Sequence, residues 1–520
     1  MRLATNISAM QANNALQRAQ TALSQSINRL SSGYKINSSK DDAAGCAISE
    51  KMRSQIRGLN QADNNASDGI SVLQTAEGAL SEIQSMLSRI KELAVQAAND
   101  VNSDDERSAI QAEIDQINAE IDRISDDTEF NTQSLINGSL QRKVYSNYSG
   151  VNQLSITDSF VDGNYGITVT EDARQAVAVA ESSISMSDSD TIAEDEAGTI
   201  SVNGYKIDIA EGDSLADVMD KIVSGFDTIG GKAFVVDSTT NDTKTNGTEY
   251  AGYVPSATSS YSGKQLVMMT SQYGSEQKYD ISCDNQKLAD LLGISSAASD
   301  EGIHVEGSDV KAEFTLDSDG NRIGFANSAV ITTKGTEITV SDVNNKSFVI
   351  DVPGNVAATV FDDTYASKVD GKSQAGSSVA ADIVQEATDA GTMSIHIGAN
   401  ENQVIILDIP EITTYTLKTD NINVMTNYTA SQAIETVDEA INKLNEARSK
   451  IGAYQNRFDH TESNLGVSVE NLTSALSSLI DTDMASEMTE YTSQTVITQA
   501  ATSILSQANE RPSEVLQLLQ

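Results

Sequence analysis

The sequence contains no tryptophan, and aromatic residues make up only 5% of its 520 residues. Aromatic side chains bury large areas and contribute strongly to compact cores. An enzyme of this length would usually contain more of them, so the composition favours a protein that is not an enzyme.

Cysteine and proline are also scarce. The two cysteines, Cys46 and Cys283, lie in segments of different character, so that a disulfide framework is excluded and a bond between them is not expected. Cys46 lies among alanines, which predicts a packed thiol. The first of the four prolines is Pro255, and none lies between Pro410 and Pro512. Both ends of the chain are therefore free to form long helices.

Basic residues are few, with 34 lysines and arginines against 75 acidic residues and a net charge of −41. The electrostatic field of this net negative charge repels nucleic acid and anionic membrane, and we expect neither as a partner. The sequence has no apolar run long enough to span a bilayer. Its N-terminus lacks an apolar signal region and a cleavage pattern, so that an extracellular location would require export by another route.

The chain divides into three segments of different sequence pattern. The pattern is helical to about residue 140 and again from residue 426, and the segment from 141 to 425 is rich in Gly, Ser, Thr, Asn and Asp. Apolar residues in the ends step by three and four, which is the spacing of a coiled-coil seam. Periodicity alone is equally consistent with an ordinary helical bundle. The steps are Leu73, Ala76, Leu80, Ile83, Leu87, Ile90, Ala94; Ile110, Ile114, Ile117, Ile121, Ile124; and Ile434, Val437, Ile441, Leu444, Ile451, Phe458, Leu465, Val469, Leu472, Leu476, Leu479.

The extreme ends carry opposite charge. Residues 1–40 contain five basic and no acidic side chains, whereas residues 481–520 contain six acidic ones and only Arg511 as a base. We expect these two amphipathic segments to pair and to become ordered only when many copies pack together, because their apolar seams are thin. The alternative is two frayed termini. The seam residues are Leu16, Leu23, Ile27 and Leu30 at one end, and Met484, Met488, Ile504, Leu505, Val515 and Leu516 at the other.

The middle predicts one or two β or α+β domains inserted between the helical ends. Asn203-Gly204 between alternating runs predicts a hairpin over 198–210. A short helix follows, with Ser214 as its N-cap. A further hairpin is predicted within 142–172. Other expected strands are 264–270, 277–283, 310–316, 322–333, 336–341, 346–352, 391–398 and 403–409. The fold class is therefore α+β and multidomain, with terminal helices in a coiled-coil-like bundle.

Patterns that would indicate catalysis or ligand binding are absent. His304, His396 and His460 have no metal-ligand neighbours at helical or hairpin spacing. No nucleophile elbow, phosphate loop or dinucleotide fingerprint occurs. The segment 317–321 resembles a calcium loop but lacks its remaining ligands, and a turn between strands is the better interpretation. We predict no catalytic, cofactor-binding or metal-binding residue.

Several motifs, in order along the chain, resemble bacterial flagellin. They cover about 230 residues at the ends closely and the middle only loosely. At the N-terminal end they are Leu30–Gly33 with Ile36–Ser38 and Asp41–Gly45, and then Arg89–Gln96. At the C-terminal end they are His396–Asn400, Gln455–Phe458, Asn464-Leu465, Glu470–Leu472, Asp481–Ala485 and Ser503–Leu519. Residues 198–225 and 264–282 are similar to a small β-rich motif of flagellar proteins.

The resemblance implies an extracellular subunit of the flagellar filament, exported without a cleaved signal peptide. Its implied partners are further copies of itself, a cytoplasmic export chaperone, the filament cap and hook-junction proteins. It also implies recognition by the host Toll-like receptor for flagellin, at positions matching Arg89, Leu93 and Glu113. The domains expected are inner-tube halves 1–40 and 481–520, bundle segments 41–175 and 426–480, and a variable outer region 176–425.

The chain departs from the family pattern at a few positions. Leu476, Ser478 and Ile480 stand where two arginines and a charged residue are common, and Ser88 and Lys91 depart from the usual receptor-binding pattern. Two alternatives remain open at this point: a hook–filament junction protein, and an adhesin displayed through the middle. The Ser/Thr-rich stretch 237–262 is a candidate for O-linked sugar.

Overall fold

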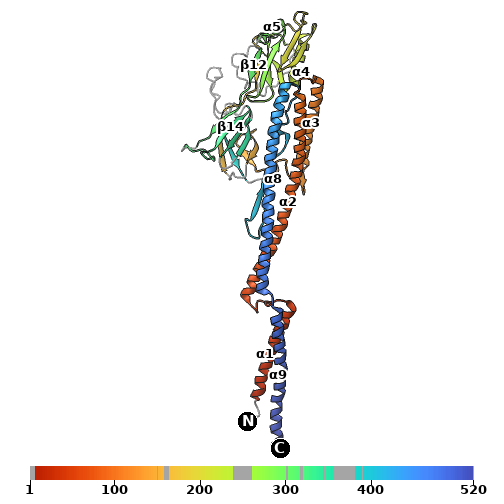
Figure 1. The fold of residues 1–520 in the computed structure, drawn as a ribbon. Helices are drawn as coiled ribbons and strands as arrows, with labels where there is room; N and C mark the ends of the chain where they lie inside the picture. The colour runs from red at the N-terminus through yellow and green to blue at the C-terminus, as the bar shows by residue number, and fades with distance from the viewer. Residues whose placement is uncertain are drawn as a thin grey trace. The chain divides into compact units, whose positions relative to one another are not determined.

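The computed structural model describes residues 6–148, 150–156, 163–237, 261–299, 302–316, 320–342, 347–352, 354, 381–388 and 391–518. Its chain forms two compact units. The first comprises Met1–Ile70, Ser394–Ile405 and Gln455–Gln520, and the second Ser71–Met393 and Ile406–Tyr454. The predicted fold class is confirmed: long helices lie at both ends of the sequence and a β-rich region lies between them (Figure 1).

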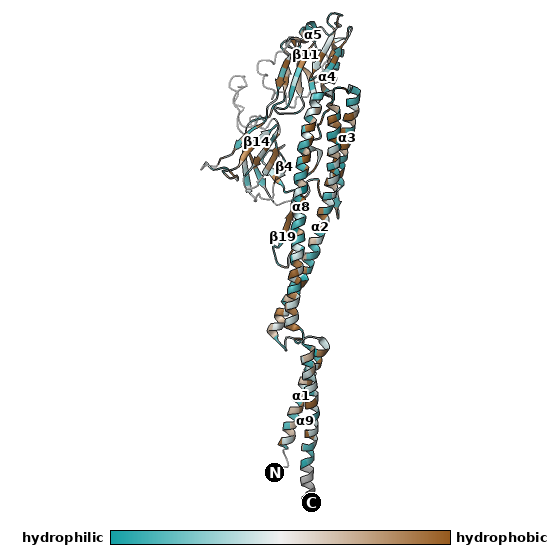
Figure 2. Cartoon of the chain, viewed as in Figure 1, coloured by the Kyte–Doolittle hydropathy of each residue, from teal (hydrophilic) through white to brown (hydrophobic). Residues whose placement is uncertain are grey.

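The long helices are α1 (Ile7–Ser32), α2 (Ala43–Ala97), α3 (Asp104–Asp127), α8 (Asn427–Ile480) and α9 (Met484–Leu518). Hydrophobic and hydrophilic residues alternate along α2 and α8 (Figure 2). All seven residues of the seam predicted for residues 73–94 are completely buried. Two ion pairs join α2 to α8 in the second unit, Lys91 to Asp438 and Arg448 to Glu77, with N–O distances of 2.5 and 2.7 Å.

The seam of α3 differs in part from the prediction. Ile114 and Ile121 are completely buried, but Ile117 and Ile124 are only half-buried. Asn118 takes a seam position, where its Nδ2 donates to the Thr419 carbonyl at 2.7 Å. A straight helix has 3.6 residues per turn, so that a strict 3.5-residue pattern drifts around its surface.

Helix ends follow local sequence. The Ser103 side chain accepts from the backbone amide of Glu106, and the Glu106 carboxylate accepts from the backbone amide of Ser103. This capping box begins α3. Ser214 begins α4 (Leu215–Thr228) with the same device, as the sequence predicts. The remaining short helices are α5 (Gln286–Leu292), the 3-10 turn η3 (Ser295–Ala298) and α7 (Thr414–Leu417).

The first β core is a small α+β arrangement with α4 packed against β8 and β9. The predicted Asn-Gly hairpin is confirmed, with both turn residues at positive φ, 48° for Asn203 and 87° for Gly204. Its two sheets have the orders β6-β10-β9 and β12-β11-β7-β8. The strands are β6 (Val177–Val179), β7 (Gly198–Val202), β8 (Tyr205–Ile209), β9 (Gly231–Asp237), β10 (Lys264–Thr270), β11 (Lys278–Cys283) and β12 (Ile303–Glu306).

The second β core, which we call the β-sandwich, joins two four-stranded sheets around an apolar cluster that includes Ile167, Phe348 and Ile350. The sheet orders are β13-β5-β17-β3 and β14-β15-β16-β4. The strands are β3 (Val144–Ser146), β4 (Asn152–Ile156), β5 (Gly163–Glu171), β13 (Lys311–Phe314), β14 (Val330–Lys334), β15 (Glu337–Ser341), β16 (Ser347–Asp351) and β17 (Ala381–Ala387). Two further pairs are β1 (Glu129–Phe130) with β2 (Gln133–Ser134), and β18 (Met393–His396) with β19 (Val404–Leu407).

Two strand predictions are wrong. Residues 142–172 do not form a hairpin, because β3 pairs with β17, β4 with β16 and β5 with both β13 and β17. The strand expected over 322–333 begins only at Val330. The guanidinium of Arg322 lies 4.0 Å from the centre of the Phe314 ring and donates to two carbonyls, which holds the preceding segment in bends.

The structure also bears on the two cysteines, on the calcium-like segment and on membrane-spanning helices. Both cysteines are free, with Cys283 buried and Cys46 half-exposed rather than fully packed. The calcium-like residues 317–319 and most of the Ser/Thr-rich stretch lie outside the described residues. Within the described part of the chain, none of the helices combines the length and hydrophobicity that crossing a bilayer requires.

The buried seam of α2 should dominate the stability of the second unit. We expect Ile90→Ala to lower its free energy of unfolding by about 2–5 kcal/mol, because the side chain is completely buried and leaves a cavity. Val95→Ala on the same helix is the control, since Val95 is 53% exposed and should change the value by less than about 0.5 kcal/mol. Urea unfolding followed by circular dichroism measures both. Equal effects of the two substitutions would contradict the described packing.

Candidate functional site

Helices α1 and α9 lie against each other through small side chains. Ala12, Ala19 and Ser26 are buried on α1 at intervals of seven residues, and Ala501 and Ala508 are buried on α9 at the same interval. Seven-residue spacing places these side chains on one face of each helix. The contact therefore lets the two backbones come close but buries little apolar area.

The residues predicted to mediate polymerisation divide into two groups. Leu16, Leu23, Leu30 and Leu505 are half-buried, flanking the small-residue seam. The other four described members face solvent. Their exposed fractions are 47% for Ile27, 49% for Met484, 49% for Met488 and 58% for Ile504. The side chains of Val515 and Leu516 lie outside the described part of the structure.

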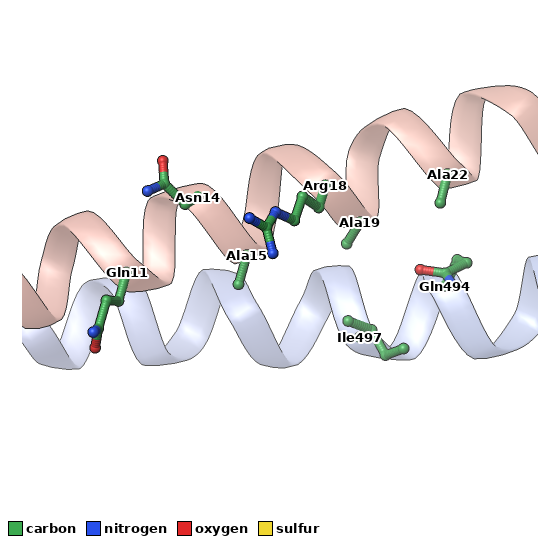
Figure 3. Close-up of a pocket in the computed structure, with 8 residues that line it drawn as sticks. All are labelled: Gln11, Asn14, Ala15, Arg18, Ala19, Ala22, Gln494 and Ile497. Carbon is green, nitrogen blue, oxygen red and sulfur yellow. The ribbon is translucent and has the colours of Figure 1, made fainter.

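A shallow groove of about 500 Å³ runs between the two helices. Figure 3 shows Ala15, Ala19 and Ala22 of α1 directed toward α9, and Arg18 lying along the groove. Its other lining residues are Gln11, Asn14, Gln494 and Ile497. Small and polar side chains dominate this lining, and it offers no arrangement of groups suited to catalysis.

Two backbone hydrogen bonds and one ion pair join the C-terminal end of α1 and the residues after it to the end of α8 and the start of α9. Gly33 ends α1 with φ of 78°, and its carbonyl accepts from the Thr482 amide at 2.9 Å. The Lys35 amide donates to the Ile480 carbonyl at 2.6 Å. The predicted opposite charges meet in the pair of Arg29 with Glu487 at 3.7 Å. The two turns that end α1 and α8 are thus joined to each other.

The segment that follows α1 is held by two adjacent aspartates. Asp41 accepts from the amides of Ser38 and Asn37 at 3.0 and 3.1 Å. The hydrogen bond from the Ser38 amide, followed by that from the Asn37 amide, lowers the pKa of the Asp41 carboxyl. Asp42 accepts from the amides of Ala44 and Gly45 and so begins α2. The Asp-Asp motif is therefore a structural device that shapes the turn between helices.

The second candidate site is the surface formed by α2 and α3 around Arg89. Its guanidinium donates to Glu113 from Nε and Nη2, at 3.0 and 2.8 Å, and pairs with Glu92 at 3.2 Å. The hydrogen bond to Glu113, followed by that to Glu92, raises the pKa of Arg89. Arg89 and Glu113 thus lie together on the surface. Leu93, the third predicted residue, is only 2% exposed and belongs to the buried core.

The small residues of the α1–α9 seam are not among those predicted from the sequence. The predicted seam residues are large and apolar, whereas the buried positions are occupied by alanine and serine. The signal was present as Ala12, Ala19 and Ser26, and as Glu487, Gln494, Ala501 and Ala508, each set at seven-residue spacing. Among the described residues no cluster of three or more histidine, cysteine, aspartate or glutamate side chains could hold a metal ion.

Two family models match the ends of the chain. Residues 3–141 match the bacterial flagellin N-terminal helical region, and residues 434–519 match the bacterial flagellin C-terminal helical region. These ranges contain α1 to α3 and most of α8 with α9. Both candidate sites lie within them.

Whole-chain relatives are also flagellins. The flagellin of Salmonella typhimurium is 31% identical over 529 residues, covering 99% of both chains. That of Clostridium tyrobutyricum is 32% identical over 506 residues, covering 96% of this chain and 98% of its own. Among solved structures, a flagellar hook-associated protein from Legionella pneumophila is 13% identical, covers 83% of this chain and 98% of its own, and has a TM-score of 0.29, too low to support an argument.

Proposed function

This chain belongs to the bacterial flagellin family, and from that premise we propose that α1 and α9 become ordered as it polymerises into the flagellar filament for motility. The observation that supports this is the mismatch between what the two helices bury and what they expose. On α1 three small residues are buried, whereas Ile7, Met10 and Ile27 are exposed. On α9 the exposed set includes Met484, Met488, Val496, Ile497 and Ile504.

The free energies involved favour helices α1 and α9 that become ordered only in contact with neighbouring copies. Ordering one backbone residue costs about 1–2 kcal/mol. A buried methyl or methylene group returns about 0.8 kcal/mol. The 26 residues of α1 bury only two alanines and one serine in the pair, so that their seam cannot offset this cost. Contacts from other subunits would supply the missing burial, and a contact that repeats without closing produces a filament.

We propose that the domains predicted from the sequence occupy three layers in the assembled filament. Residues 1–40 and 481–520 would form the inner tube, residues 41–175 and 426–480 the surrounding bundle, and residues 176–425 the outer region. The protein would act outside the cell as a structural subunit without catalytic activity. The names of its whole-chain relatives favour a filament subunit over a junction protein.

Partners other than copies of the chain are also proposed. An export chaperone would hold the C-terminal segment before assembly, and the cap and hook-junction proteins would contact the same helical ends at the two limits of the filament. For the host Toll-like receptor, Arg89 and Glu113 would form the contact surface, since both are exposed and paired. Leu93 would support them from the core.

Removal of residues 481–520 tests the assembly role. We expect the truncated chain to form no filaments, because α1 loses its seam partner and the inner tube loses one of its two helices. The second unit should still melt cooperatively, since it contains none of the deleted residues. Electron microscopy and calorimetry measure the two outcomes. Filaments formed by the truncated protein would rule out the mechanism.

A single exposed side chain tests the apolar surface. Met488→Gln should slow polymerisation and raise the protein concentration that it requires, because it removes apolar contact between copies. The melting temperature of the monomer should stay the same, since Met488 is 49% exposed. Thr489→Gln, also on the exposed surface of α9, is the matched control. Light scattering follows the assembly, and identical curves for both variants would argue against this surface.

Receptor recognition can be tested with purified components. We expect Arg89→Ala to weaken binding to the receptor ectodomain, because it removes both the guanidinium and the partner that positions Glu113. Arg123→Ala is the control: Arg123 lies on α3 and also forms exposed ion pairs, with Glu120 and Asp127. Surface plasmon resonance compares the two. Equal affinity of Arg89→Ala and the parent protein would remove Arg89 from the site.

A further inference from the structure

The contacts between α8 and the β-sandwich are polar. The apolar cluster of the β-sandwich and the half-buried side chains packed on it include no residue of α2, α3 or α8 among the residues described. The sandwich instead presents its β14–β15 hairpin to α8 through charged side chains. Among the described residues, its contacts with α8 are therefore made by charged side chains and not by this apolar cluster.

Two residues of the hairpin carry the contact. Lys334 ends β14 and Glu337 begins β15, and they are cross-strand partners on either side of the turn. Lys334 Nζ lies 2.6 Å from Glu439 Oε1 and 3.1 Å from Glu276 Oε1. Glu337 Oε2 lies 2.7 Å from Lys418 Nζ and 3.4 Å from Lys443 Nζ.

The helix carries the complementary order of charges. Glu439 and Lys443 are four residues apart on α8 and thus lie on one face in successive turns. The hairpin presents a positive and then a negative charge, and the helix a negative and then a positive one. Turning the hairpin end for end would bring like charges together, so that this charge quartet (Lys334, Glu337, Glu439 and Lys443) selects one orientation.

Neighbouring hydrogen bonds hold the hairpin in shape. Asp309 Oδ1 accepts from the Gly335 amide at 2.9 Å, and Thr336 Oγ1 donates to Asp351 Oδ1 at 2.5 Å. On the same face of α8, Tyr428 and Gln432 donate to the Glu276 carbonyl at 3.2 and 2.6 Å. The turn is thus preorganised before it meets the helix.

Burial strengthens these pairs without removing them from water. The side chain of Glu337 is 16% exposed, and those of Lys418 and Lys443 are 34% exposed. Burial alone would raise the pKa of the Glu337 carboxyl, but Lys418 and Lys443 outweigh it and the pKa is lowered. Burial alone would lower the pKa of Lys334, but Glu439 and Glu276 outweigh it and the pKa is raised.

We propose that the charge quartet is a latch that docks the β-sandwich on α8 and releases the hairpin as one unit when its ion pairs are broken. Each pair by itself is weak because it is partly solvated. The four charges act together because one short turn carries two of them. The latch goes beyond polymerisation and operates in the single chain, since all four residues belong to the second unit.

Lysine labelling of the full-length monomer tests the latch. The probe is an amine-reactive acetyl ester, read out residue by residue by mass spectrometry. We expect Glu337→Gln to increase labelling of Lys334 by about two- to fivefold, the population change that loss of partly exposed ion pairs allows. The side chain of Lys334 is 43% exposed in the docked state, and its partners Glu276 and Glu439 are untouched by this substitution. An increase in its labelling therefore reports that the hairpin has moved away from those two partners.

Controls distinguish release from local or global effects. Glu313→Gln on β13 removes an exposed carboxylate for which the described residues provide no ion pair, and it should leave Lys334 unchanged. Labelling of Lys206 on β8 is the internal reference. Lys443→Gln removes the pair between Glu337 and α8 but leaves the pair with Lys418. It should increase labelling of Lys334 in the same direction by a smaller factor, and it replaces Glu337→Gln if that variant folds poorly. Raising the salt concentration from about 0.1 to 1 M should have the same effect on the parent protein, since the screening length falls from about 10 to 3 Å.

The proposal is overturned if Lys334 labelling stays at the parent value in both variants, whether or not labelling of Lys418 changes. The ion pairs would then be local and would not act as a latch. Polymerisation is measured separately on the same variants, and its presence or absence does not affect this outcome.

Discussion

The contact between α1 and α9 is made by small side chains, and this limits how much of the molecule one copy can stabilise. Alanine and serine at seven-residue spacing let two backbones approach, but they return little hydrophobic free energy. The seam of α2 consists of leucine, isoleucine and alanine and is completely buried. The contact between α1 and α9 therefore contributes much less hydrophobic free energy than the seam of α2. This difference is the physical basis of the assembly mechanism that we propose.

The second constraint is that the cores of the molecule are separate. The α+β core and the β-sandwich have their own apolar clusters, and within the described residues neither cluster includes a side chain of α2, α3 or α8. Polar contacts join them to the segment that precedes α8: Asn423 donates to the Thr228 carbonyl at 2.9 Å, and Tyr415 of α7 donates to Asp351 at 2.8 Å. Changes inside a β core would then leave the helical seam intact.

Local signals in the sequence predicted the local structure. The three-and-four spacing located the buried face of α2, Ser214 located the start of α4, and Asn203-Gly204 located a hairpin because that turn requires positive φ. Strand pairing was not predicted, because β4 pairs with β16 almost two hundred residues away and no local signal specifies such a partner. The α1–α9 seam was missed for a different reason: alanine is common in helices, so that its spacing is less informative than that of leucine. The motif resemblance named Arg89, Leu93 and Glu113 as receptor-binding positions but gave no indication that Arg89 and Glu113 form an ion pair or that Leu93 is buried.

The pairing of Arg89 with Glu113 bears on the receptor recognition that we propose for this surface. Both side chains are about half exposed, at 51% and 46%, and a pair of this kind contributes little to stability because water already solvates its charges. A partner that offers its own carboxylate or donor can therefore replace one of them at low cost. The pair still holds the guanidinium in one orientation before the partner arrives, which reduces the entropy lost on binding. Leu93, one turn further along α2, is only 2% exposed, so that the charged pair lies next to a buried position of the same helix.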